Sequence, residues 1–258
     1  MSRLAFITGA SSGIGQALAL RCYSQGYDLA LSGRRVDEIE RWTAAAGLAQ
    51  NRFAIYQADV AQIDQIVEAG TRCIAAQGLP DVVVANAGIS VAVDTGRRSD
   101  LDAVARTLAT NVTGLAATFQ PFVALMRARG SGRLVGIASV AGIRGLPGHA
   151  AYCASKAAVI AYCESLRGEL SSVGVRVVTI VPGYIDTPLT RKNRYPMPFL
   201  MPPDAFAAKA LATIEAGRSY RVLPWQMAAV SKLLRLLPDP LLDRVLRGQP
   251  RKQRDDVP

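Results

Sequence analysis

The chain has 258 residues, of which 50% are hydrophobic and 19% are charged, and its formal net charge at pH 7 is +10. This size and composition are typical of a globular α/β protein with a large core. The basic residues are scattered without an aromatic-and-basic pattern, and no residues have zinc-site spacing, so we expect no nucleic-acid partner and no metal site. No window supplies the roughly 20 apolar residues of a membrane span.

The cysteines indicate a reducing compartment. Cys22, Cys73, Cys153 and Cys163 lie far apart and form no CxxC pair. Without a disulfide framework they are expected to be reduced thiols. The apolar start at residues 4–7 is too short for a signal peptide. We therefore expect a cytoplasmic protein.

The N-terminal segment predicts a phosphate-binding site. A short apolar strand at residues 4–7 is followed by the loop TGASSGIG at residues 8–15, and residues 16–23 predict a helix. Glycines let the backbone approach a pyrophosphate, and a helix N-terminus offers free N–H groups and a positive partial charge. A glycine triplet alone is a weak signal, but its place directly after the first strand strengthens it.

The end of the second strand favours NADP over NAD. Residues 27–32 predict this strand, and Gly33, Arg34 and Arg35 follow it. An acidic residue at this point would accept a hydrogen bond from the 2′-hydroxyl of NAD, whereas arginines suit a 2′-phosphate. The first acidic residue, Asp37, lies too far along the chain. The alternative is that the two arginines only solvate a helix start.

The remaining strands alternate with helices. We expect strands at 53–56, 82–84, 134–138, 177–181 and 220–224, helices at 62–77 and 204–216, and a long helical segment at 100–127 that Asn111 and Gly114 kink or interrupt. Strands alternating with helices predict a parallel, doubly wound α/β sheet in one Rossmann-like domain. Ligands bind at the carboxyl ends of such strands, where Asn86, Ser139 and Pro182-Gly183 would meet the glycine loop.

The helix that opens near Tyr152 predicts acid–base chemistry. Residues four apart share a helix face, so the Tyr152 phenol would lie beside the Lys156 ammonium. A cation about 6 Å away favours the phenolate by about two pKa units at an effective dielectric of about 20. That shift would bring Tyr152 into the range of a general acid or base. The alternative is a buried aromatic beside a snorkelling lysine.

Taken together, the motifs resemble those of the short-chain dehydrogenase/reductase family over about residues 3–190. The resemblance rests on the loop at residues 8–15, Asn86-Ala87-Gly88, Asn111, Ser139, Tyr152-x-x-x-Lys156 and Pro182-Gly183, in the order and spacing of the family. It implies hydride transfer between a nicotinamide and a carbonyl or alcohol.

The resemblance also implies roles for four catalytic residues. Tyr152 would exchange a proton with the substrate oxygen, and Ser139 would hold that oxygen. Lys156 would bind the nicotinamide ribose and lower the pKa of Tyr152. Asn111 would hold a water that links Lys156 to solvent.

The cofactor contacts implied by the resemblance run along the whole rim. They are Gly9, Ser11, Ser12, Gly13, Ile14, Gly15, Arg34, Arg35, Asp59, Val60, Asn86, Ala87, Gly88, Tyr152, Lys156, Pro182, Gly183, Ile185 and Thr187. Among them, Ser11, Ile14 and the loop glycines would meet the phosphates, Arg34 with Ser11 the 2′-phosphate, Asp59 and Val60 the adenine, Asn86 the ribose, and Ile185 and Thr187 the carboxamide.

The sequence gives a less specific signal for the substrate-binding region than for the cofactor site. We expect residues 1–223 to form the NADP-binding domain, with a lid at about 188–216. Arg191, Lys192 and Arg194 in the lid are either solvated or contact an acidic substrate group, and the apolar residues after them suggest an adaptable apolar pocket. The sole histidine, His149, is expected to be exposed, with substrate contact as the alternative.

Residues 224–258 predict a C-terminal extension. Apolar stripes at 225–237 and 241–246, separated by Pro238-Asp239-Pro240, indicate two amphipathic helices, followed by a disordered polar tail at 248–258. The stripes would pack on the domain or on a partner subunit. The sharper alternative is peripheral attachment of residues 225–247 to an anionic membrane.

The sequence thus predicts an NADP(H)-dependent oxidoreductase that reduces an apolar or lipid-like ketone. The alternative is an NADP-binding regulator or scaffold on the same fold without turnover. The resemblance further implies a homodimer or homotetramer through the helices at 100–127 and 152–172.

Overall fold

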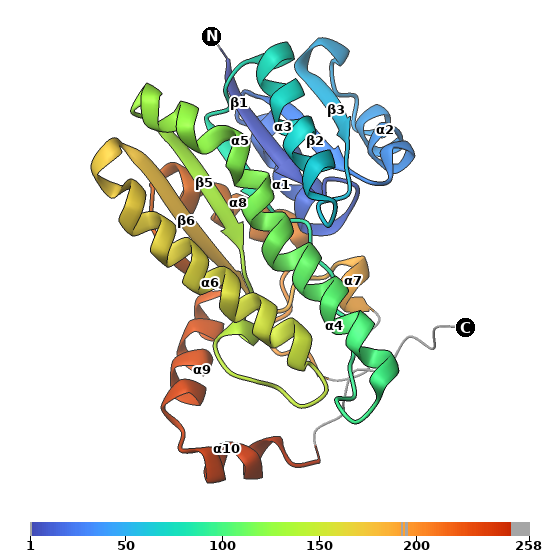
Figure 1. Cartoon of the computed structure of the whole chain (residues 1–258), viewed down its shortest axis with the longest axis vertical. Coiled ribbons are helices and arrows are strands. Elements are labelled where there is room, and N and C mark those ends of the chain that lie inside the picture. Colours follow the sequence, from blue (N-terminus) through green and yellow to red (C-terminus); the bar gives the residue numbers. More distant parts are fainter. Residues whose placement is uncertain (1, 192, 194–195, 249–258) are drawn as a thin grey trace.

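A single parallel sheet of seven strands lies at the centre of the computed structural model, which describes residues 2–191, 193 and 196–248 (Figure 1). The strand order is β3-β2-β1-β4-β5-β6-β7. The strands are β1 Arg3–Thr8, β2 Tyr27–Gly33, β3 Phe53–Gln57, β4 Val82–Ala85, β5 Gly132–Ile137, β6 Val175–Pro182 and β7 Tyr220–Leu223. All neighbouring pairs are parallel, which confirms the predicted doubly wound fold.

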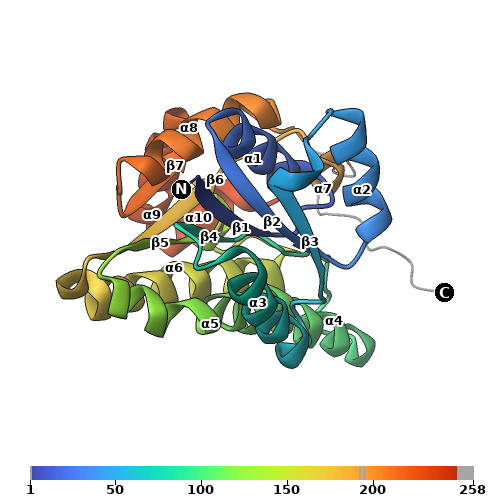
Figure 2. The ribbon, with the colours of Figure 1, turned by 90° about the horizontal axis from the view of Figure 1, so that it is seen from above.

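Helices cover both faces of the sheet, which explains why its central strands are continuous apolar runs. Figure 2 shows α3, α5 and α6 on one face and α1, α2 and α8 on the other. Their bounds are α1 Gly13–Ser24, α2 Val36–Ala45, α3 Ile63–Gln77, α5 Gly114–Arg129, α6 Ala150–Leu170 and α8 Pro203–Glu215. Each face has its own hydrophobic core. Phe6 and Phe122 pack together in the core on the side of α3, α5 and α6, and Tyr27 and Phe206 are fully buried in the core on the side of α1, α2 and α8.

The long segment at 100–127 is interrupted where the sequence predicted it. Helix α4, Leu101–Leu108, runs into a wider π-helical turn at Ala109–Thr113, and α5 follows directly. The turn carries Asn111, whose side chain is almost fully buried. A π-helical turn inside a helix frequently marks a functional position.

Two helices fall within the segment predicted as a lid, and they lie in different places. Helix α7, Pro188–Arg191, lies near the rim of the sheet, whereas α8 buries Phe206, Leu211 and Ile214 against the core on the α1 side. That the segment acts as a lid stays a prediction. Lys192 and Arg194 lie outside the described residues.

The C-terminal extension forms α9, Trp225–Leu236, and α10, Asp239–Leu246. Met227, Ser231 and Leu242 on their inner sides are buried against the rest of the chain, whereas Leu236 is 81% exposed. Packing on the domain therefore holds for the inner side of the stripes. Among the described helices, none is both long and apolar enough to cross a bilayer. The predicted polar tail after Gly248 lies outside the described residues.

Candidate active site

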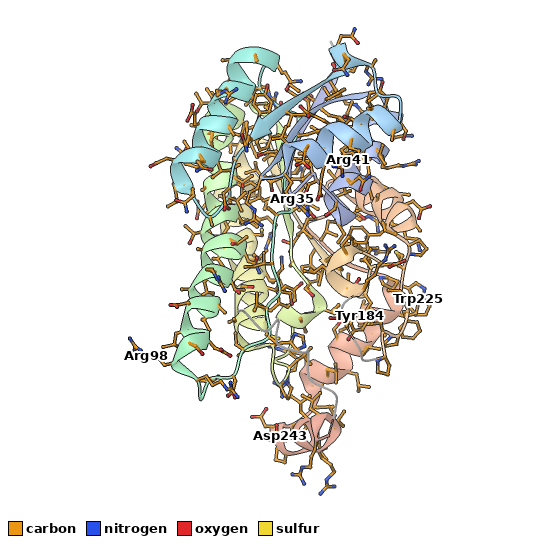
Figure 3. All side chains as sticks on the ribbon, turned by 90° about the vertical axis from the view of Figure 1, so that its right-hand side faces the viewer. Arg35, Arg41, Arg98, Tyr184, Trp225 and Asp243 are labelled. Carbon is orange, nitrogen blue, oxygen red and sulfur yellow. The ribbon has the colours of Figure 1, made fainter. Side chains whose placement is uncertain are left out.

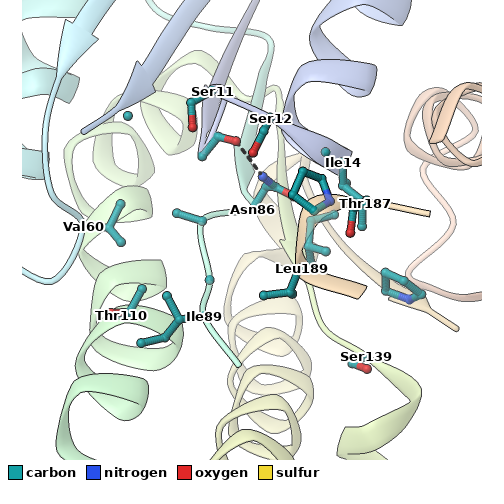
Figure 4. A pocket seen from close by; sticks show the side chains of 18 of the residues that line it. Ser11, Ser12, Ile14, Val60, Asn86, Ile89, Thr110, Ser139, Thr187 and Leu189 are labelled. Atoms are coloured by element: carbon teal, nitrogen blue, oxygen red, sulfur yellow. Dashed lines mark hydrogen bonds between the residues drawn. The ribbon is translucent and has the colours of Figure 1, made fainter. Parts of the chain in front are cut away.

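A cavity of about 240 Å³ opens at the carboxyl ends of the strands, between β1 and β4. At this point the order in which successive strands are added to the sheet reverses. This switch point is where open parallel sheets bind ligands. Figure 4 shows Ser11 and Ser12 at one end of the cavity and Ser139 at the other. Of the predicted site residues, all except Gly15 and Asn111 line it. Lining residues that the sequence did not single out are Gly33, Ala58, Ile89, Thr110, Ile137, Ala138, Pro188, Leu189 and Thr190.

The glycine loop is folded tightly at the entrance of α1. Gly9 has a φ of +66°, and a Cβ added at Gly15 would lie 2.2 Å from the Gly9 carbonyl oxygen, so the backbone needs a glycine at both positions. Ser12 makes no side-chain cap, and the first turn of α1 holds no acidic residue. The first N–H groups of α1 and its positive partial charge can therefore act on a bound phosphate.

Thr8 and Asn86 clip the glycine loop to the end of β4. The backbone N–H of Asn86 donates to Thr8 Oγ1 at 3.0 Å, and Asn86 Nδ2 donates to the Thr8 carbonyl oxygen at 2.9 Å. Asn86 was predicted to meet a ribose. It lines the cavity, but its amide nitrogen is used to hold the loop in place.

The two arginines after β2 take different directions. Arg35 Nη2 donates to Ser11 Oγ at 3.0 Å, while Arg34 forms an ion pair with Asp59 at 3.6 Å. The resemblance paired Arg34 with Ser11, and the structure places Arg35 there instead. Both arginines line the cavity beside the glycine loop.

The predicted catalytic residues come together from β5 and α6. Lys156 Nζ lies 5.8 Å from the centre of the Tyr152 ring and donates to the Ile137 carbonyl oxygen at 2.8 Å. Ser139 lies two residues after the end of β5, and its hydroxyl accepts from the Ala141 N–H at 3.2 Å. Lys156 is only 5% exposed, so the ammonium is held inside the protein.

Burial controls the proton affinities of the pair. It raises the pKa of the Tyr152 phenol, and a hydrogen bond with Ser139 acts in the opposite direction. It also lowers the pKa of Lys156 from 10.5 to about 8. The net direction for the pKa of Tyr152 is therefore upward, whereas the sequence predicted that Lys156 would lower it. Desolvation disfavours the charged form of both residues.

Asn111 is tied into the back of the site. Its Oδ1 accepts from the Ile89 N–H at 2.8 Å, and its Nδ2 donates to the Ile89 carbonyl oxygen and to Ser155 Oγ, both at 2.9 Å. A Cβ on Gly88 would lie 3.2 Å from Asn111 Oδ1 and 3.5 Å from Lys156 Nζ, so these two side chains meet at Gly88. Sequence reasoning missed Ile89 and Ser155, although Ile89 directly follows Asn86-Ala87-Gly88 and Ser155 lies within Tyr152-x-x-x-Lys156.

A smaller chamber of about 80 Å³ adjoins the cavity on the substrate side. Its lining contains both apolar and polar residues. The residues are Ser90, Ser139, Val140, Ala141, Leu146, His149, Tyr152, Gly183, Tyr184, Leu189, Thr190 and Asn193. His149 is only 8% exposed, so the expectation of an exposed histidine is wrong. The chamber brings His149 to the same space as Ser139 and Tyr152.

Comparison with known proteins gives one family throughout. The family described as short chain dehydrogenase matches residues 3–197. An "Uncharacterized oxidoreductase" of Myxococcus xanthus is 39% identical over 245 residues, which is 95% of this chain and 96% of that protein. The solved structure "ElxO with NADP Bound" has a TM-score of 0.77 at 22% identity and covers 86% of this chain and 97% of its own. Levodione reductase has a TM-score of 0.78 at 25% identity and covers 88% of this chain and 98% of its own.

Proposed function

This chain belongs to the short-chain dehydrogenase family of oxidoreductases, and we propose that it is an NADPH-dependent reductase of apolar ketones. One observation carries the proposal. Ser139, Tyr152 and Lys156 line the same cavity as the glycine loop and the two arginines. A dinucleotide stretched between these ends would bring its nicotinamide to the tyrosine.

The residues of this chain fit a bound NADPH, which would supply the hydride. The Ser139 hydroxyl would hold the carbonyl oxygen of the substrate. Because burial keeps the Tyr152 phenol protonated at neutral pH, Tyr152 would donate its proton to that oxygen as charge develops on it. Lys156 would bind the nicotinamide ribose and fix the position of Tyr152. This state of the phenol favours carbonyl reduction over alcohol oxidation.

The preference for NADP rests on the chemistry at the end of β2. Arg35 reaches Ser11 and Ser12, Arg34 pairs with Asp59, and both arginines line the same cavity. Two guanidinium groups suit a 2′-phosphate. Among the described residues that line the cavity, the one carboxylate, Asp59, is already paired with Arg34 and so is a poor acceptor for a ribose 2′-hydroxyl. The similar fold of ElxO, which binds NADP, agrees with this proposal.

Replacing Arg35 tests the cofactor preference. We expect Arg35→Ala to raise the dissociation constant of NADPH about 10- to 100-fold, because it removes charge-assisted hydrogen bonds to the 2′-phosphate. NADH has no such phosphate, so its dissociation constant should change less than about threefold. Arg34→Ala should act in the same direction. Fluorescence titration with both cofactors measures these values.

Arg41→Ala is the matched control, because Arg41 is exposed on α2 and pairs with Asp37 rather than with the glycine loop (Figure 3). It should bind both cofactors as the unchanged protein does. Equal weakening of NADPH and NADH by Arg35→Ala and Arg34→Ala would contradict the assignment of a 2′-phosphate site.

The substrate chamber supports an apolar ketone. Val140, Ala141, Leu146 and Leu189 supply apolar surface beside the reacting groups. Levodione reductase, which by its name reduces levodione, has a similar structure. A screen of NADPH oxidation over keto lipids, steroids, sugars and small aromatic ketones identifies the class. Turnover confined to sugars would contradict the apolar assignment.

A cofactor-binding regulator without turnover is the second candidate. A regulator would need the glycine loop and the arginines but not the proton-donating group. The positions of Ser139, Tyr152, Lys156 and Asn111 are all filled and lie together in the structure. This favours the enzyme.

Two exposed apolar surfaces bear on assembly. The first is a groove over α5 and α6, lined by Phe119, Val123 and Tyr162 among others, and it supports the proposed homodimer or homotetramer. The second is the outer side of α9, where Leu233 and Leu236 are exposed. Sedimentation without vesicles tests self-association through the groove, and sedimentation with anionic vesicles tests membrane attachment through α9 and α10. We expect the mass of a dimer or tetramer without lipid. A monomer would contradict the first proposal, and equal recovery with and without vesicles would exclude membrane attachment through 225–247.

A further inference from the structure

One loop forms part of the wall of the substrate chamber. Residues 140–149 connect β5 to α6 and supply Val140, Ala141, Leu146 and His149 to the chamber. Ser139 precedes this loop and Tyr152 follows it. Any shift of the loop therefore changes the space beside the reacting groups while leaving the cofactor end of the cavity in place.

The C-terminal helices hold the outer side of this loop. Arg144 Nη2 donates to the Leu237 carbonyl oxygen at 3.0 Å and to Asp239 Oδ1 at 2.7 Å. In the reverse direction, Arg235 Nη1 donates to the Ile143 carbonyl oxygen at 3.0 Å. Two adjacent loop residues are thus bonded to both sides of the break between α9 and α10.

The geometry of the break makes Arg144 a good partner for it. Leu237 is the capping residue directly after α9, where helix carbonyl groups lack partners inside the helix and carry a negative partial charge. Asp239 is 85% exposed at its side chain, so its ion pair with Arg144 contributes little by itself. The loop is therefore held more by two hydrogen bonds to backbone carbonyl oxygens than by the ion pair. These are the bond from Arg144 to Leu237 and the bond from Arg235 to Ile143.

The same extension touches the site at a second point. A Cβ added at Gly183 would lie 2.7 Å from Met227 Cγ, so the start of α9 packs directly against Gly183. Gly183 lines both the cofactor cavity and the substrate chamber. Figure 1 shows α9 and α10 beyond the carboxyl ends of β5 and β6, at the same end of the molecule as the loop.

We propose that Arg144 and Arg235 are positioning residues that fasten the C-terminal helices to the loop at 140–149 and so set the shape of the substrate chamber. The inference rests on the proposed ketone reduction. It assigns residues 225–246 to the substrate site, although none of the groups that exchange hydride or proton lies there.

The test is the kinetic behaviour of Arg144→Gln in the full chain with a ketone from the screen. We expect KM for the ketone to rise about tenfold, because two hydrogen bonds from a charged donor are lost. The kcat and the dissociation constant of NADPH should stay within about twofold, since the reacting groups and the cofactor end are untouched. Arg144→Lys, which keeps the charge and one bond, should recover part of the loss.

Arg244→Gln on the exposed side of α10 is the matched control and should leave KM unchanged. An unchanged KM for Arg144→Gln, or an equal loss of NADPH binding, would overturn the proposal.

Hydrogen exchange separates this proposal from the failure of the proposed function. In Arg144→Gln, backbone amides at 140–149 should exchange faster, while those at 160–170 inside α6 should not change. This readout does not depend on turnover. If the unchanged protein reduces no ketone, the proposed function fails, and identical exchange at 140–149 in both proteins would overturn the fastening as well.

Discussion

Tyr152→Phe should lower turnover about a thousandfold while the dissociation constant of NADPH changes less than about twofold. The substitution removes one oxygen atom and keeps the buried ring, so the fold and the cavity should be preserved. The lost hydroxyl is hydrogen-bonded with Ser139, and the centre of its ring lies 5.8 Å from Lys156 Nζ. Steady-state kinetics and a binding titration on the same preparation give both numbers.

Tyr220→Phe controls for the chemistry of the substitution. Tyr220 begins β7 and is 46% exposed at the amino end of the strand, far from the carboxyl-end rim. Its removal should leave both kinetic constants unchanged. Turnover retained by Tyr152→Phe would remove Tyr152 from the proton-donating role.

Lys156→Met should abolish measurable turnover and also change how stability depends on pH. Burial lowers the pKa of Lys156 to about 8 in the folded protein, against 10.5 for the free side chain. Between these values the unfolded chain binds more protons than the folded one, so the stability of the unchanged protein rises with pH relative to the methionine variant. The difference in free energy of unfolding should grow in its favour by about 2 kcal/mol between pH 7 and pH 9.5.

Urea unfolding of both cofactor-free proteins at several pH values measures this difference. The remaining cysteines and tyrosines titrate in both proteins, so their effects largely cancel. Lys209→Met, at an exposed position of α8, is the matched control for replacing a lysine by methionine. A constant difference for Lys156→Met would mean that its ammonium is not destabilised by burial.

The fold and the position of the site could be predicted because local pattern decides them. The valine run at 82–84 and the strand at 177–181 are buried on both faces, and the helices between strands carry apolar stripes. Parallel strands then place their carboxyl ends on one rim. The sequence alone is therefore enough to predict that Asn86, Ser139 and Gly183 lie on the same rim.

Properties that depend on depth and direction could not be predicted. The spacing of Tyr152 and Lys156 gives their shared helix face, but the pKa of each follows from how much water surrounds it. The sequence likewise cannot say which of Arg34 and Arg35 faces Ser11, or that His149 is buried in the chamber.

Long-range contacts of the C-terminal extension were also beyond local pattern. Arg144 and Asp239 are 95 positions apart and belong to no recognised motif. The amphipathic stripes showed that α9 must be buried on one side, and only the structure shows what the helix holds. Leu233 and Leu236 belong to the apolar stripe that the sequence predicted, and they are exposed on the outer side of α9.

Transfer of deuterium from NADPH labelled at C4 tests the central claim most directly. With a ketone from the screen, the unchanged protein should place one deuterium on the carbon of the new alcohol, detected by mass spectrometry. Tyr152→Phe should do so about a thousandfold more slowly. The claim would be contradicted if the protein bound NADPH but labelled no ketone, or if Tyr152→Phe transferred deuterium at the unchanged rate.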